Sequence, residues 1–173
     1  EAREAIEWAE QYDGLQEAWT QCERGDWMLW LVGRMAKSKR DRQQLALAAC
    51  ACARLALPYV PVGETHPLHA IEITERWARG EVGVTLKMVR HTIVATYAAA
   101  HVAYATNAIY AIYAAYAAHI AYAATYASTY AATYAAYAAT YAANYASNAA
   151  TRISVLNQCA DIVRHYYPTM EVK

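Results

Sequence analysis

The feature that most constrains the fold is a stretch from His91 to Thr151 that contains no Asp, Glu, Lys, Arg, Gly or Pro. It consists mainly of Ala and Tyr, with Thr, Ser and Asn interspersed. Alanine has the highest helix propensity, and the stretch lacks both residues that commonly break helices. The sequence therefore predicts an α-helical conformation over most of this length.

The spacing of the large residues changes along this Ala/Tyr stretch. Between Tyr104 and Tyr122 a Tyr, Asn or His occurs at every third position, so large side chains go all the way round the helix. From Tyr122 on, the steps are mostly four, which is close to the helical period. This spacing predicts a slowly drifting row of rings, the tyrosine stripe, formed by Tyr126, Tyr130, Tyr134, Tyr137, Tyr141 and Tyr145, with Thr and Asn side chains beside it.

Two arrangements of the stretch fit the sequence. One straight helix would be about 90 Å long at about 1.5 Å per residue, which exceeds a compact domain of this size. We favour a chain that folds back once or twice at polar positions such as Thr106-Asn107, Ser128-Thr129 or 144–148. The alternative is a long helix that self-associates, because so much uncharged surface would otherwise face water.

The charges divide the chain into two portions. Every Asp, Glu, Lys and Arg lies before His91 or after Thr151, and the formal net charge of the 173 residues is zero. We therefore expect a charged, Trp-rich helical portion over 1–84 and an Ala/Tyr-rich portion with a closing helix over 85–173, together forming one cooperative unit. A net charge of zero provides no overall electrostatic attraction to nucleic acid or to an anionic membrane. The chain begins at Glu1 rather than Met, which leaves open whether further residues precede it. It shows no signal peptide.

Local signals place helices in the first portion. Helices are predicted over 1–10 and 15–22, and Asp26 is predicted as the N-cap of a third. This N-cap also explains the tripeptide Arg24-Gly25-Asp26 without an adhesion function. The helical spacing of the third helix predicts a buried Trp-rich face of Trp27, Trp30, Leu31, Arg34 and Met35.

Further signals delimit the remaining helices. A central, largely buried helix is predicted from Ser38 to Leu57, where Pro58 stops it, and another is predicted to end at Gly80 as its C′ residue. Thr85 is predicted to cap the next helix. After Thr151 an apolar face of helical period predicts a closing helix that packs back on the first half of the chain. No strand pattern occurs, so we predict an all-α multi-helix bundle with a long Ala/Tyr-rich region.

The four cysteines indicate neither a disulfide framework nor a zinc site. Cys50 and Cys52 are two residues apart in a helical run and so face different directions, and Cys22 and Cys159 lie far away in sequence. They are typical of small buried residues, and we expect a reducing, cytoplasmic location without metal or cofactor.

Four segments resemble a poorly characterised bacterial and phage family whose members are labelled immunity proteins. The segments are Ala18-Trp-Thr-Gln-Cys-Glu-Arg-Gly-Asp-Trp-Met-Leu-Trp30, Ala49-Cys-Ala-Cys-Ala-Arg-Leu-Ala-Leu-Pro-Tyr-Val-Pro61, Ala70-Ile-Glu-Ile-Thr-Glu-Arg-Trp-Ala-Arg-Gly80 and Cys159-Ala-Asp-Ile-Val-Arg-His-Tyr-Tyr-Pro168. The resemblance spans nearly the whole chain and implies a toxin-neutralising or phage-inhibiting role. It implies no catalytic residue.

The tyrosine stripe has two main interpretations. In the first, its rings fill the gaps between packed helices, with each phenol bonded to Thr, Asn or a carbonyl. In the second, it binds a protein partner, because Tyr provides large contact area with few rotatable bonds. We take the six stripe tyrosines as the candidate partner-binding residues. The partner is unknown: it is a toxin under the family reading, or another copy of this chain in a homo-oligomer.

Other functions fit the residues less well. Thr129, Thr140 and Thr151 are eleven apart, as in Ala-rich ice-binding helices, but bulky Tyr spoils a flat surface. The uncharged length suffices for membrane spans, yet Ala, Thr and Tyr are much less apolar than Leu. His101 and His119 would be about 27 Å apart on one straight helix, too far for one metal ion. No base and nucleophile are brought together by sequence, so we predict a non-enzymatic protein.

Overall fold

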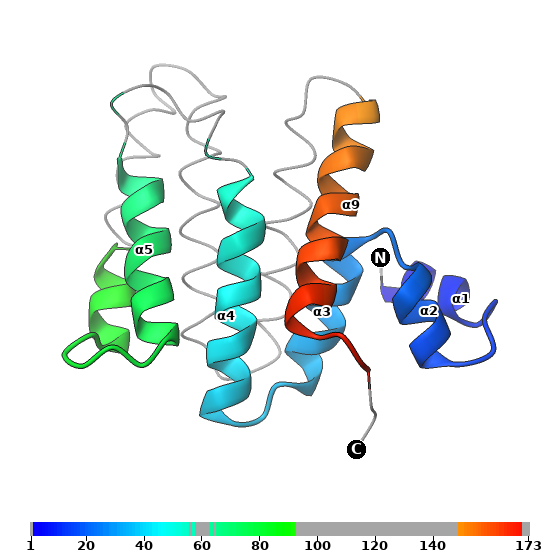
Figure 1. The fold of residues 1–173 in the computed structure, drawn as a ribbon, viewed down its shortest axis with the longest axis horizontal. Coiled ribbons are helices and arrows are strands. Elements are labelled where there is room, and N and C mark those ends of the chain that lie inside the picture. The colour runs from blue at the N-terminus through cyan, green and yellow to red at the C-terminus, as the bar shows by residue number, and fades with distance from the viewer. Residues whose placement is uncertain (1, 56, 58–62, 64, 93–148, 171–173) are drawn as a thin grey trace.

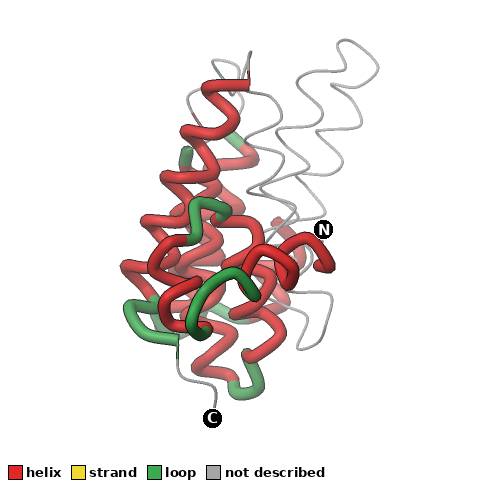
Figure 2. Tube along the Cα trace, turned by 90° about the vertical axis from the view of Figure 1, so that its right-hand side faces the viewer, coloured by secondary structure: helices red, strands yellow, loops and turns green. Residues whose placement is uncertain are grey.

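The computed structural model of the chain describes residues 2–55, 57, 63, 65–92 and 149–170. These residues form helices joined by loops, with no strand among them (Figure 2). The helices are α1 (Ala2–Ala9), α2 (Leu15–Gln21), α3 (Gly25–Met35), α4 (Lys39–Arg54), α5 (His66–Ala78) and α9 (Ala149–Tyr166), and residues 86–92 are helical as well. The predicted all-α fold class is confirmed.

The helix α4 occupies the centre of the described part. It contacts α5 on one side and both α3 and α9 on the other, and it runs antiparallel to α5 and α9 (Figure 1). The short helices α1 and α2 lie at the edge, beyond α3 and α9 (Figure 1). The predicted return of the closing helix onto the first half of the chain is confirmed, because α9 packs against α3 and α4.

The start of α4 follows from its sequence. The Ser38 hydroxyl accepts a hydrogen bond from the Asp41 N–H (3.1 Å), and the Asp41 carboxylate accepts one from the Ser38 N–H (2.8 Å). This reciprocal capping box satisfies two backbone donors that a helix start leaves unpaired. The helix ends at Arg54, earlier than the predicted Leu57. Residue 57 precedes a proline, which disfavours the α conformation there.

The core is built around the buried face of α4. This face carries mainly small side chains, so neighbouring helices approach closely: Leu45, Ala46, Ala48, Ala49, Cys50, Cys52 and Ala53. Met28 and Leu29 of α3, Ile71 of α5 and Val163 of α9 pack into the same cluster. A second cluster joins Ala46 to Ile73, Trp77 and Val89. The prediction that α4 is central and largely buried is confirmed.

The end of α5 also follows the prediction. Gly80 has a φ of 76°, and its N–H donates to the Trp77 carbonyl (3.0 Å) while the Glu81 N–H donates to the Arg76 carbonyl (3.0 Å). This pair of bonds is a Schellman motif, whose left-handed residue is usually glycine. Thr85 caps the next helix, since its Oγ1 accepts from the Met88 N–H (3.3 Å).

The helix α3 differs from the prediction in its start and in its buried face. Arg24, not Asp26, is the N-cap residue. Asp26 lies in the first turn, only 3% exposed, where the Arg24 guanidinium donates to both its carboxylate oxygens (2.8 and 2.6 Å). The predicted Trp27/Trp30 face is only half-buried, and the residues that enter the core are Met28, Leu29 and Val32.

The buried face of α3 differs from the predicted one because Gly25 lies in close contact with α9. A Cβ atom built on Gly25 would lie 2.6 Å from the Ala160 nitrogen and the Cys159 carbonyl carbon, and it would also overlap the Cys159 Cβ. Only a residue without a side chain fits at that distance. The side of α3 that continues from Gly25 therefore faces α9, and the tryptophan side faces α1 and α2. A presented Arg-Gly-Asp loop is ruled out because Gly25 and Asp26 are buried.

Within the residues that the structure describes, no helix has the length and apolar character needed to cross a membrane.

Candidate interaction surface

The six tyrosines of the predicted stripe, Tyr126, Tyr130, Tyr134, Tyr137, Tyr141 and Tyr145, lie outside the described residues. The Ala/Tyr stretch is described only at its ends, where residues 91–92 and 149–151 are helical as predicted. The partner-binding role of the stripe and the division of the chain at residue 84 therefore stay predictions.

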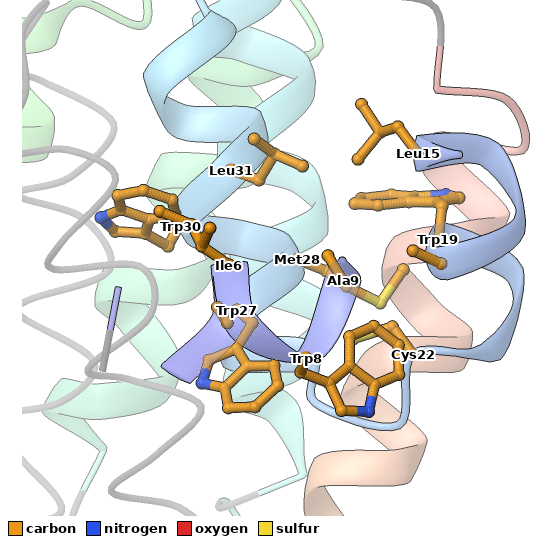
Figure 3. A pocket seen from close by; sticks show the side chains of 12 residues that line it. Ile6, Trp8, Ala9, Leu15, Trp19, Cys22, Trp27, Met28, Trp30 and Leu31 are labelled. Carbon is orange, nitrogen blue, oxygen red and sulfur yellow. The ribbon is translucent and has the colours of Figure 1, made fainter. Parts of the chain in front are cut away.

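In the described part, an apolar depression opens between α1, α2 and α3 (Figure 3). We call it the tryptophan hollow. Its volume is about 130 Å³. The lining residues are Ala5, Ile6, Trp8 and Ala9 of α1, Leu15, Ala18 and Trp19 of α2, Cys22 of the following turn, and Trp27, Met28, Trp30 and Leu31 of α3. Leu15 and Trp19 lie on one side of it, and Trp30 and Leu31 lie on the other (Figure 3).

Aromatic rings hold α1 against α3 at this hollow. The Trp8 ring lies 5.9 Å from the Trp27 ring and 4.8 Å from the Tyr12 ring, both in tilted arrangements. The Arg24 guanidinium lies 4.3 Å from the centre of the Trp27 ring, a cation–π contact. The Trp27 indole N–H is covered by other atoms, and no residue that the structure describes accepts a hydrogen bond from it.

The α2 wall of the hollow is fixed to α9 by long-range hydrogen bonds. The Arg164 guanidinium donates to the carbonyls of Cys22 (2.6 Å) and Trp19 (3.3 Å), and the Trp19 indole N–H donates to the Tyr167 carbonyl (2.9 Å). Arginine satisfies the carbonyl groups that the end of a short helix leaves unpaired. The hollow is therefore set in position by the closing helix.

The cysteine thiols have the properties of structural residues. Burial raises the pKa of Cys22 and that of Cys50. A hydrogen bond with the Cys159 side chain, together with burial, raises the pKa of Cys52. A thiol must lose its proton to act as a nucleophile or a metal ligand. These three thiols are therefore protonated near neutral pH and pack as small apolar groups, as the sequence predicted.

The buried carboxylate of α5 is also committed to packing. Glu75 is 8% exposed, and its two oxygens accept hydrogen bonds from Arg54 of α4 (2.8 and 3.0 Å). Arg79 lies 3.3 Å from the same carboxylate. Burial alone would raise the pKa of Glu75, but the hydrogen bonds and charge of Arg54 outweigh this and lower it below its usual 4.5. In the described ranges, no three His, Cys, Asp or Glu side chains lie close enough together to hold a metal ion.

The hollow is the surface that sequence reasoning missed. The signal for it was present, since Trp8, Trp19, Trp27 and Trp30 all occur within the first thirty residues. Helical periodicity assigned two of them to the core, because it identifies an apolar face without indicating which neighbour covers it. The contact of α9 with Gly25 determines which face of α3 is covered.

The described residues define an all-α protein with an apolar hollow between α1, α2 and α3. The chain belongs to the family described as "Imm-5 like putative immunity protein", whose model matches residues 36–165. The family resemblance stated from the sequence is thus confirmed, and the family suggests an immunity-type role for the chain. No curated protein and no solved structure matches the chain.

Proposed function

We propose that the chain neutralises a protein toxin by binding it and that it carries out no chemical reaction. The observation that carries this proposal is membership of an immunity family over 36–165. Two features of the described residues support it. The buried Glu75 is held in ion pairs between α4 and α5. The thiols whose pKa values are raised pack in the core.

The tyrosine stripe is our proposed partner-binding surface. Tyr combines an apolar ring, which loses water on binding, with a hydroxyl that bonds to polar groups of the partner. Thr125, Thr129, Thr133, Thr140 and Asn144 each precede a stripe tyrosine and supply short polar side chains beside the rings. A surface of this kind binds protein without needing charge, and the stretch contains none.

Replacing Tyr134, Tyr137 and Tyr141 together by Ala tests this surface. We expect the variant to keep its helical circular dichroism and cooperative unfolding but to lose at least about 2 kcal/mol of binding free energy, about thirtyfold in Kd, because interface tyrosines carry a large share of binding energy. The measurement is a titration of the toxin by calorimetry or surface plasmon resonance.

The matched control changes Tyr104, Tyr110 and Tyr113 to Ala, which removes the same groups from the region without a stripe. Unchanged binding by the control and weakened binding by the stripe variant support the interface. If the stripe variant unfolds instead, the rings are core residues and the proposed surface is wrong.

Self-assembly is a second candidate function, and the uncharged length of 91–151 favours it. Light scattering coupled to size-exclusion chromatography separates the two: a defined homo-oligomer in which the stripe is buried would leave the toxin no access to it.

A further inference from the structure

The tryptophan hollow lies before the part of the chain that the family model matches. The family match begins at residue 36, whereas every residue that lines the hollow lies before it. The family model therefore does not cover this surface. Since α9 holds α2 in place through Arg164, the hollow is nevertheless part of the folded core structure.

The interior of the hollow suits one large apolar side chain. Its volume of about 130 Å³ is close to that of a cavity, about 150 Å³, that takes a benzene molecule. The rings of Trp8, Trp27 and Trp30 are half-buried there, and Ile6 is 53% exposed at its edge. Apolar surface that is left partly open to water and surrounded by polar residues is typical of an interaction site.

The segment that carries α1 and α2 is strongly acidic. Residues 2–23 contain six carboxylates and one base, Arg3, which gives a formal net charge of −5. All six carboxylates belong to exposed residues on or next to α1 and α2: Glu4, Glu7, Glu10, Asp13, Glu17 and Glu23. Like charges gathered in one place raise the local concentration of cationic partners and speed their association.

We propose that the tryptophan hollow docks a cationic segment of a protein partner, in which a large apolar side chain is flanked by Lys or Arg. The apolar side chain fills the hollow, and the flanking cations face the carboxylates of α1 and α2. Arg24 already lies over the Trp27 ring, and the rings of Trp8 and Trp30 offer further aromatic surface to the cations of the partner. This proposal rests on the proposed function, since the toxin is the partner that carries the segment.

The segments of this chain itself fit the hollow less well. The Ala/Tyr stretch has no Lys or Arg to face the carboxylates. The turn between α3 and α4 is basic, with Arg34, Lys37, Lys39 and Arg40 exposed, but its apolar residues Met35 and Ala36 pack against the core. In a second copy of the chain, this turn could therefore present positive charge to the hollow, but it has no apolar side chain free to insert.

The test uses the full chain and two short fluorescent peptides. In the first peptide, a Leu is flanked on both sides by lysines. In the second peptide, glutamates replace the lysines. We expect fluorescence polarisation to show binding of the lysine peptide alone, weakening as salt screens the charges. The variant Glu10→Lys/Glu17→Lys should lower this affinity at least about tenfold. Ile6→Ser should lower it severalfold without changing its dependence on salt.

The control is Glu72→Lys, a single reversal of an exposed carboxylate on α5, on the far side of α4 from the hollow. It should bind the lysine peptide as the unmodified chain does. Equal affinities for Glu72→Lys and the double reversal would overturn the proposal, as would equal binding of the two peptides. Self-association that the double reversal abolishes would assign the hollow to a second copy and overturn it too.

The docking proposal and the proposed function can be disproved independently of each other. Undiminished toxin neutralisation by Glu10→Lys/Glu17→Lys would overturn the hollow as the toxin's docking site and leave the proposed function standing. Peptide binding that follows the expected pattern, in a chain that neutralises no toxin, would overturn the proposed function instead.

Discussion

Replacing Gly25 by Ala should destabilise the protein by about 3 kcal/mol or more, because the added methyl group would lie 2.6 Å from backbone atoms of α9. Helix propensity alone would favour Ala by up to about 1 kcal/mol. The sign of the effect therefore separates the two influences. Chemical denaturation followed by circular dichroism gives the change in the free energy of unfolding.

The double variant Gly25→Ala/Cys159→Gly provides the control for this result. It removes the Cys159 Cβ but leaves the Cys159 carbonyl carbon and the Ala160 nitrogen in contact with the new methyl group. We expect little recovery of stability, since backbone atoms move only with the whole helix. A Gly25→Ala variant as stable as the unmodified protein would show that α3 and α9 do not approach at this point.

Removing Arg54 should cost more than removing the charge of its partner Glu75. Arg54→Met leaves a carboxylate that is 8% exposed with only the longer contact to Arg79, so we expect a loss of about 2 kcal/mol. Glu75→Gln should cost about half as much, because the 40% exposed Arg54 side chain can be hydrated. The double variant Arg54→Met/Glu75→Leu should recover most of the loss.

The same pair predicts a dependence on pH. The pKa of Glu75 is lower in the folded protein than its usual 4.5, so its ion pairs stabilise the fold fully above about pH 4.5, and this stabilisation is lost as pH falls through the lowered pKa. The deficit of Arg54→Met should therefore be largest near neutral pH and shrink on acidification. Denaturation curves over this range measure it, and a deficit that grows toward low pH would contradict the assigned role of the pair.

The helix boundaries that follow from the sequence are those set by neighbouring residues. Ser38 and Asp41 form a capping box within four residues, and Gly80 closes a Schellman motif with the turn before it. Such signals act between neighbouring residues, so they can be recognised from the sequence alone. The buried face of α4 follows as well, because an Ala- and Cys-rich helix with few charges has to pack on several neighbours at once.

The features that did not follow depend on specific contacts that residue type and spacing do not reveal. Asp26 has the residue type of an N-cap, but Arg24 pairs with it inside the first turn, where a carboxylate also interacts favourably with the helix dipole. The orientation of α3 depends on Gly25 meeting Cys159, which no periodicity reveals. The tryptophan hollow results from that orientation. The tyrosine stripe lies outside the described residues, and its partner-binding role stays a prediction from residue spacing.

Neutralisation by binding rather than by chemistry is the central claim, and a titration of toxin activity tests it most directly. Fixed amounts of the toxin are mixed with increasing amounts of the chain, and the remaining toxin activity is measured at several times after mixing. Our account predicts a linear loss of activity that ends at a fixed molar ratio and does not change with time. Progressive inactivation of many toxin molecules by each chain, or full toxin activity at every ratio, would contradict it.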